Sequence, residues 1–346
     1  MLAARVLVPA LTAALAVLLL LSAAVGTISV SAADAVRLVV GHLLPGMPWM
    51  TDGSYTALQD NAVWQFRLPR ALLAAITGAA LALAGALMQV VVHNPLAEPY
   101  ILGVSAGAGV GAVSLIVFGV GASSLAIGSA AFLGALLATA AVYLLSQRHG
   151  RIAPQRLILA GVALGSLFSA VTSYLTITTD AQNVFSIMFL LLGSVSAATM
   201  THLALPAAAL LGVLAFTAFR ARALNALLAG DDAATSLGVN VNRLRSSVLI
   251  AAALLTGSVV AVSGGIGFVG LVIPHVARIV VGTDHRRTLP VATLGGAVFL
   301  TGADLLARTV AAPTEIPLGV LTALVGAPFF LWLLRRDRAD SVGMSR

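Results

Sequence analysis

Two glycine-containing stretches match motifs that carry chemistry in other proteins. Residues 103–107 (Gly-Val-Ser-Ala-Gly) fit the elbow that exposes a nucleophilic serine, and residues 265–270 (Gly-Ile-Gly-Phe-Val-Gly) fit the loop that binds the pyrophosphate of a dinucleotide. Both motifs act where a strand of an open α/β sheet leads into a helix. Neither stretch follows such a strand, so the sequence predicts neither chemistry. An intramembrane protease using Ser105 also lacks a histidine expected at the same membrane level.

Other catalytic and metal-binding patterns are missing from the sequence. It has no His-Glu-x-x-His motif, no phosphate-binding glycine loop with lysine, no carboxylate pair and no cysteine. We therefore expect no catalytic residue, no metal site and no cofactor bound by this chain.

The composition is that of an integral membrane protein. Of 346 residues, 60% are hydrophobic and only 9% are charged, against roughly a quarter in soluble domains. The basic side chains are all arginine, and they lie at the ends of apolar segments rather than in a stripe with aromatic residues. They indicate orientation in a lipid membrane and not nucleic-acid binding.

The apolar segments predict an all-α, polytopic fold of ten transmembrane helices in a single domain, residues 1–346. Val6 to Ala33 contains no charge and no convincing cleavage site, which favours a retained helix over a signal peptide. The other expected spans are 67–92, 100–118, one ending near 146, 157–177, 203–219, 244–262, a short one ending at 281, 289–307 and 316–334. We expect an external loop at 31–66, a partial helix between 180 and 200, and a cytoplasmic loop at 220–245 with a short helical piece at 224–228.

The arginines predict the orientation of this fold. With the amino terminus inside, only Arg37, Arg67, Arg70 and Arg308 of the 19 arginines fall outside. The positive-inside rule then places both termini in the cytoplasm. A motif beginning at Arg67 recurs weakly at Arg243, five helices later, which indicates an inverted repeat.

A break is expected between the second and third spans. Pro95 and Pro99 cannot continue a helix, so residues 94–98 should separate two helices. Gly103, Gly107 and Gly111 then recur at intervals of four, which predicts close packing against another helix.

Motifs spread from Arg67 to Arg336 together resemble the FecCD-type permeases. The matching stretches are Arg67-Leu-Pro-Arg70, 85–89, Asn94-Pro-Leu-Ala-Glu-Pro99, 102–108, 267–271, Pro274-His-Val-Ala-Arg278, Ala303-Asp304, 315–319 and 326–329. These proteins are the membrane subunits of ATP-driven importers for iron-siderophores, haem and vitamin B12. The resemblance implies a homodimer with two ATPase subunits inside, which bind ATP and Mg²⁺, and a solute-binding protein outside.

The resemblance also implies roles for individual residues. Arg67, Arg70 and Arg308 would dock glutamates of the binding protein, although they could merely anchor helix ends, and Asp304 could pair with Arg308. Asn94 and Leu96 would form a cytoplasmic gate, although a plain turn is the alternative.

The resemblance places the ATPase-coupling helix after Gly230. Asp231 and Asp232 would cap this helix, and Ala233, Ala234, Leu237 and Gly238 would offer the ATPase a small, flat face. A solvated loop is the alternative.

The substrate is not fixed by these motifs. An iron-siderophore is the first expectation, with haem and cobalamin behind it, and Phe189 and Met200 depart from tryptophans common in relatives. His275 is expected to make a structural hydrogen bond, whereas His42 and His202 could contact haem transiently. The rival class is a proton-coupled secondary transporter, in which Asp304 would carry the proton.

Overall fold

The computed structural model describes residues 2–44, 46–119, 123–148, 151–312 and 314–343. The α-helices are α1 (Leu2–Ala24), α2 (Ala32–Leu43), α3 (Ala57–Asn61), α4 (Leu68–Val92), α5 (Val104–Phe118), α6 (Ser124–Ser146), α7 (Pro154–Ile177), α8 (Ala181–Leu192), α9 (Ala204–Leu227), α10 (Asp231–Ser236), α11 (Val241–Ser263), α12 (Val269–Val281), α13 (His285–Val310) and α14 (Leu318–Gly343). Shorter elements are η1 (Pro48–Met50), η2 (Ala62–Arg67), η3 (Pro99–Leu102), η4 (Met200–Leu203) and the antiparallel pair β1 (Gln147–Arg148) and β2 (Arg151–Ile152).

The all-α prediction is confirmed, and each of the ten expected spans contains a helix. Within the described residues, seven helices are long and apolar enough to cross a membrane. Shorter apolar helices occupy the third, eighth and tenth expected spans, as α5, α12 and the first part of α14. The expected partial helix is α8. The chain is therefore a multi-pass membrane protein.

Two boundaries were wrong. The first helix ends at Ala24 rather than residue 33, because Ser31 caps a separate helix by accepting a hydrogen bond from the Asp34 amide. Helix α9 continues to Leu227, so residues 224–228 are not a separate piece and the connection to α11 is shorter than 220–245. Leu224 and Leu227 are fully buried, and this packing continues the helix past the polar residues.

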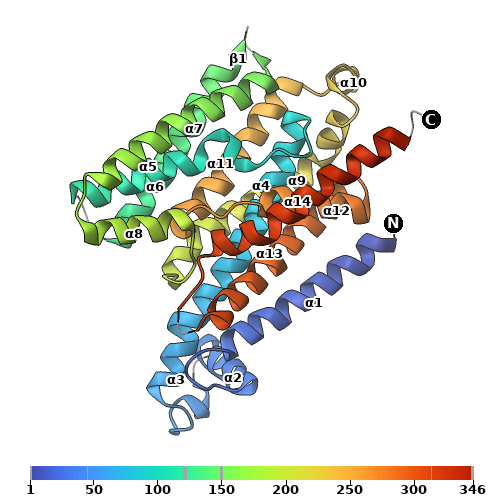
Figure 1. Cartoon of the computed structure of the whole chain (residues 1–346). Helices are drawn as coiled ribbons and strands as arrows, with labels where there is room; N and C mark the ends of the chain where they lie inside the picture. Colours follow the sequence, from blue (N-terminus) through green and yellow to red (C-terminus); the bar gives the residue numbers. More distant parts are fainter. Residues whose placement is uncertain (1, 45, 120–122, 149–150, 313, 344–346) are drawn as a thin grey trace.

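Helix α4 forms the centre of the molecule. Every residue from 77 to 92 is buried, and α13, α11 and α12 pack around this helix (Figure 1). Glycines permit the closest approaches: a Cβ on Gly78 would meet the Gly296 carbonyl, and one on Gly85 would meet the Gly270 carbonyl. A helix buried on all faces in this way is fixed in position by its neighbours.

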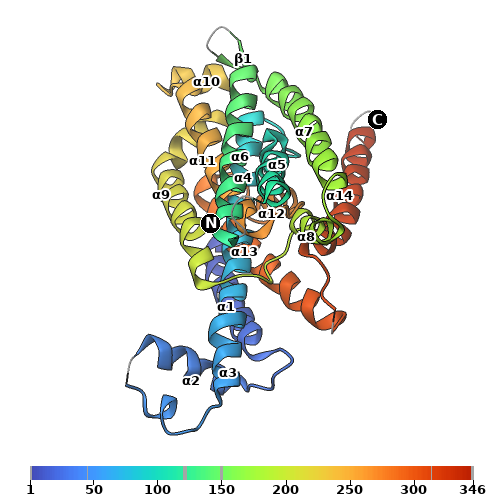
Figure 2. The same ribbon diagram turned by 90° about the vertical axis from the view of Figure 1, so that its left-hand side faces the viewer.

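The two sides of the helix assembly differ. Helices α2 and α3 project from one side, here called the α3 side, as Figure 2 also shows. Helix α10, the β1–β2 hairpin, the start of α1 and the end of α14 lie toward the opposite side, the α10 side.

Candidate functional site

A buried ion pair lies at the end of α4 on the α3 side. The Asp304 carboxylate in α13 is fully buried and accepts hydrogen bonds of 2.9 and 3.2 Å from Nε of Arg70. The Arg70 guanidinium also donates to the half-exposed carboxylate of Glu315 at 2.7 Å. Arg308 is a weaker partner of Asp304, with 3.8 Å between charged atoms. The anticipated pairing within α13 is therefore secondary to a pair between α4 and α13.

Arg67 and Arg308 hold the end of α1. Arg67 donates to the carbonyls of Ala24 at 2.7 Å and Ile28 at 2.5 Å, and Arg308 donates to the carbonyl of Ser22 at 2.8 Å. The last carbonyls of a helix lack partners within the helix, and cations satisfy them well. Both guanidinium groups therefore fix α1 against α4 and α13.

The three arginines line one cavity of about 580 Å³ on the α3 side. Its wall comes from residues 25–28 after α1, from α3 and η2, and from the end of α13, with Ser196 and Glu315 contributing polar atoms. Arg67 is only 7% exposed and all three arginines have partners within the chain. The cavity nevertheless presents positive charge to this side, and the docking role stays a prediction.

The break after α4 packs against a second break after α11. Glu98 Oε1 accepts a hydrogen bond of 2.7 Å from the amide of Phe268, and the Tyr100 hydroxyl donates to the Ile266 carbonyl and accepts from its amide. Phe268 has a positive φ of 67°, which is uncommon for a bulky side chain, and its amide donates the hydrogen bond to Glu98. Side-chain bonds thus satisfy irregular backbone inside the helix assembly.

The expected gate residues lie in the first of these breaks. Asn94 and Leu96 are both half-buried, and the Asn94 side chain accepts a hydrogen bond of 2.9 Å from the Leu96 amide. This bond closes a local turn. Asn94 and Pro95 also line a cavity of about 210 Å³, together with Arg278 and His285. The turn is real, and whether it closes a pore stays a prediction.

The short helix α10 exists as predicted, with a different local structure. Gly230 is its N-cap and no side chain caps it, because Asp231 instead binds Arg245 at 2.8 Å. Ala234 is fully buried, so it cannot belong to an exposed face, whereas Leu237 is 71% exposed. The surface available to a partner therefore consists of Leu237 and its exposed neighbours Asp232 and Gly238, with Ala233 half-buried.

The glycine stripe of α5 packs against α6 at two of its three positions. A Cβ on Gly107 would meet the backbone of Gly134, and one on Gly111 would meet the carbonyl of Ala130. Gly103 instead precedes the helix with φ 68°, and a Cβ there would have ordinary contacts at 3.9 Å. Its glycine is needed for the left-handed backbone rather than for close packing.

Replacing Gly111 by alanine should destabilise the fold. The clashing atom is a backbone oxygen, which can move only if α5 and α6 separate, so we expect a loss of about 1–3 kcal/mol in unfolding free energy. Gly212 in α9 is a matched control, because a Cβ added there would have no neighbour within 4 Å and alanine favours helix by up to about 1 kcal/mol. Denaturant unfolding in one detergent compares the variants. Equal stability would show that α5 and α6 are not closely packed.

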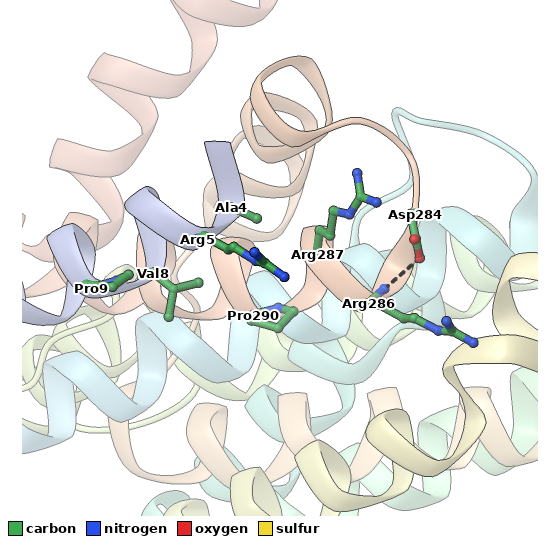
Figure 3. A pocket seen from close by; sticks show the side chains of 8 residues that line it. All are labelled: Ala4, Arg5, Val8, Pro9, Asp284, Arg286, Arg287 and Pro290. Carbon is green, nitrogen blue, oxygen red and sulfur yellow. Dashed lines mark hydrogen bonds between the residues drawn. The ribbon is translucent and has the colours of Figure 1, made fainter. Parts of the chain in front are cut away.

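A basic pocket lies on the α10 side between α1 and the start of α13 (Figure 3). Arg5, Arg286 and Arg287 line this pocket of about 610 Å³, and their guanidinium groups form no hydrogen bond to another described residue. Asp284 beside them caps α13, and the hydrogen bond from Asn225 lowers its pKa below the ordinary value. Free arginines at this level are typical of the cytoplasmic surface of a membrane.

The remaining candidate residues, the histidines and Ser105, lie outside the sites described above. His42 stacks on Trp64 and bonds Asp60 at 2.7 Å on the α3 side, and His202 lies 3.0 Å from the Ser124 hydroxyl. Ser105 lines a small cavity between α5, α8 and α11 whose lining contains no histidine. His275 lies in the middle of α12, and its hydrogen-bonding role stays a prediction.

Two sets of hydrogen bonds connect parts of the candidate sites, and the sequence motifs did not indicate them. Arg245 and His93 connect α10 to the end of α4, and Glu98 joins the two breaks. Arg245 lies in the polar start of α11, two residues after the exposed Arg243, so the local sequence does not distinguish the buried arginine from the exposed one.

These features define a class of protein. A buried central helix, two interrupted helices meeting inside the molecule, a positively charged cavity on one side and a short surface helix on the other are typical of a membrane transport permease.

Comparison with known proteins narrows the class. A model of the FecCD transport family matches residues 14–336. The hemin transport system permease protein HmuU of Yersinia pestis is 42% identical over 294 residues, which cover 82% of this chain and 87% of that protein. The vitamin B12 import system permease protein BtuC of Vibrio cholerae is 41% identical over 298 residues, covering 86% and 89%. A solved structure, the inward-facing conformation of a metal-chelate type ABC transporter, matches with a TM-score of 0.82 and 33% identity, covering 95% and 98%.

The chain belongs to the FecCD transport family. It is a permease of the ABC importer class rather than an enzyme, and ATP hydrolysis belongs to a separate subunit.

Proposed function

We propose that this protein is one half of a homodimeric permease that imports a metal chelate, with an iron-siderophore as the first candidate. The observation that carries the proposal is the match across nearly the whole chain to a metal-chelate type transporter and to hemin and vitamin B12 permeases. The free arginines of the α10 side support a cytoplasmic position for that side and for both termini, in a bacterial inner membrane.

Side-by-side uptake tests the substrate. The permease is reconstituted in vesicles with its ATPase and binding protein, and accumulation of a ferric siderophore, haem and cobalamin is measured under the same conditions. We expect the siderophore to accumulate at least about tenfold faster than the other two, since a wrong ligand leaves polar groups unpaired. Faster uptake of haem or cobalamin would reassign the substrate within the same family.

We further propose that the cavity on the α3 side receives the solute-binding protein. Arg67, Arg70 and Arg308 give this cavity its positive charge, which would steer carboxylates of the partner toward it. Glu315 shares Arg70 and is itself half-exposed, so a glutamate of the partner could replace it.

The α10 side would bind two ATPase subunits, one for each permease. Leu237 and its neighbours supply the contact, and ATP with Mg²⁺ binds to the ATPase. The turn at Asn94 and Leu96 would then form the inner gate where the two permease subunits meet. Its half-burial and its position beside the 210 Å³ cavity support this assignment.

A cysteine at position 96 tests the gate in this naturally cysteine-free chain. We expect Leu96→Cys to cross-link between subunits in the closed state, and several-fold less when ATPase closure opens the inner end. The yield is read on gels in nucleotide-free and nucleotide-trapped complexes. If these thiols never react while control pairs elsewhere do, Leu96 is not at the constriction, and the next candidate is the 147–155 connection.

A further inference from the structure

His93 ends α4 and makes two side-chain contacts. It has a left-handed backbone, with φ 52°, and its Nε2 lies 3.0 Å from the Leu227 carbonyl while its Nδ1 lies 3.1 Å from Nη2 of Arg245. A carbonyl only accepts and a guanidinium only donates, so Nε2 carries the hydrogen and Nδ1 accepts. A single neutral tautomer of His93 satisfies both partners.

Arg245 joins this histidine to the short helix α10. Its side chain is buried, and its two terminal nitrogens donate to the two carboxylate oxygens of Asp231 at 2.8 and 2.9 Å. This fork-like pairing fixes the relative orientation of the two groups. Because Nη2 is shared between Asp231 and His93, a displacement of Asp231 also displaces the partner of His93.

Both contacts of His93 come from the segment around α10. Leu227 is the last residue of α9, four residues before Asp231, and Arg245 holds Asp231 itself. On its other side, His93 leads directly into the turn at Asn94, whose amide bonds the Gln89 carbonyl at 3.2 Å. The His93 side chain thereby links the loop that follows α4 to the end of α9 directly, and to α10 through Arg245.

We propose that Arg245 and His93 are positioning residues that transmit a displacement of α10 to the turn at residues 94–96. The proposal rests on the coupling and gating roles given above, and it assigns the connection between them to one hydrogen-bonded chain, Asp231–Arg245–His93. A side chain that only stabilised the fold would leave the turn insensitive to substitutions in α10.

The chain offers variants with matched controls. His93→Asn keeps a residue that tolerates the left-handed backbone while removing the ring that reaches both partners. Arg245→Met keeps the length of the side chain and removes its donors. Arg243→Met is the control on the same helix as Arg245, because Arg243 is exposed. Asp180→Asn is the control for Asp231→Asn, because Asp180 is exposed, precedes α8 and makes no side-chain cap bond there.

The first experiment tests, without nucleotide, whether substitutions in the Asp231–Arg245–His93 chain change the mobility of the turn at residues 94–96. A nitroxide spin label on Leu96→Cys reports the mobility of the turn in the assembled complex in lipid. We expect Asp231→Asn, Arg245→Met and His93→Asn each to change the line shape, and Asp180→Asn and Arg243→Met to leave it unchanged. An unchanged spectrum in Asp231→Asn would overturn the proposal, whether or not the gate responds to ATP.

The second experiment measures transmission. In the parent complex we expect vanadate trapping of ATP hydrolysis to change the mobility of the label, and this change should fall about fivefold or more in His93→Asn. Retention of the ATPase on purification shows that a variant is assembled. If Arg245→Met does not assemble, the result with His93→Asn alone tests the proposal. A full response in His93→Asn would overturn the connection while leaving the gate intact, whereas no response in the parent would overturn the gate.

Discussion

Replacing Asp304 by asparagine should lower the free energy of unfolding by about 3–5 kcal/mol. The carboxylate is fully buried and is the shared partner of Arg70 and Arg308, whose side chains are themselves largely enclosed. Without its charge, two guanidinium groups face each other in a medium that screens them poorly. Denaturant unfolding of the purified permease in detergent measures the loss.

Glu315→Gln is the control for this prediction. Glu315 also bonds Arg70, but its side chain is 40% exposed, so its removal should cost about 1 kcal/mol or less. A stable Asp304→Asn protein that no longer transports would instead support a proton-carrying Asp304. Equal stability of the two variants would show that the pair between α4 and α13 is not essential to the fold.

A charge at position 237 should strongly weaken the contact with the ATPase. Leu237 is 71% exposed at the end of α10, where an apolar side chain suits an anchor in a partner's pocket. Leu237→Glu should weaken binding by about 2 kcal/mol or more, roughly thirtyfold, measured as ATPase retained on the purified permease. Gly238 is unsuitable for the test, because its φ of 81° makes any substitution strain the backbone.

Leu58→Glu provides the matching change on the opposite side. Leu58 in α3 is 64% exposed and lines the cavity on the α3 side. The Leu58→Glu protein should retain the ATPase. Undiminished ATPase on the Leu237→Glu protein would mean that α10 is not the docking element.

The positions of the helices could be predicted because lipid restricts what the chain can do. Long apolar runs must be helical to satisfy their backbone, and Pro95 and Pro99 mark the break after α4 from sequence alone. The end of α9 could not be predicted in the same way. Its extension depends on Leu224 and Leu227 packing against other helices, which the local sequence does not show.

The partners of charged residues were the least predictable part of the sites. Asp304 and Arg308 are four apart in sequence, and this spacing indicated their pair, yet the stronger partner, Arg70, lies more than 200 residues away. Asp231 was expected to cap α10 because acids favour helix starts, but Arg245 competes for the same carboxylate. Long-range ion pairs of this kind require the packing to be known.

The energy source of transport tests the central claim most directly. Vesicles containing the permease with its ATPase and binding protein are given either ATP inside or a proton gradient alone, and uptake of the preferred chelate is measured. We predict uptake with ATP and none with the gradient, lost when the ATPase is omitted. Uptake driven by the gradient without ATPase would contradict the assignment as an ABC importer permease and would restore the secondary transporter.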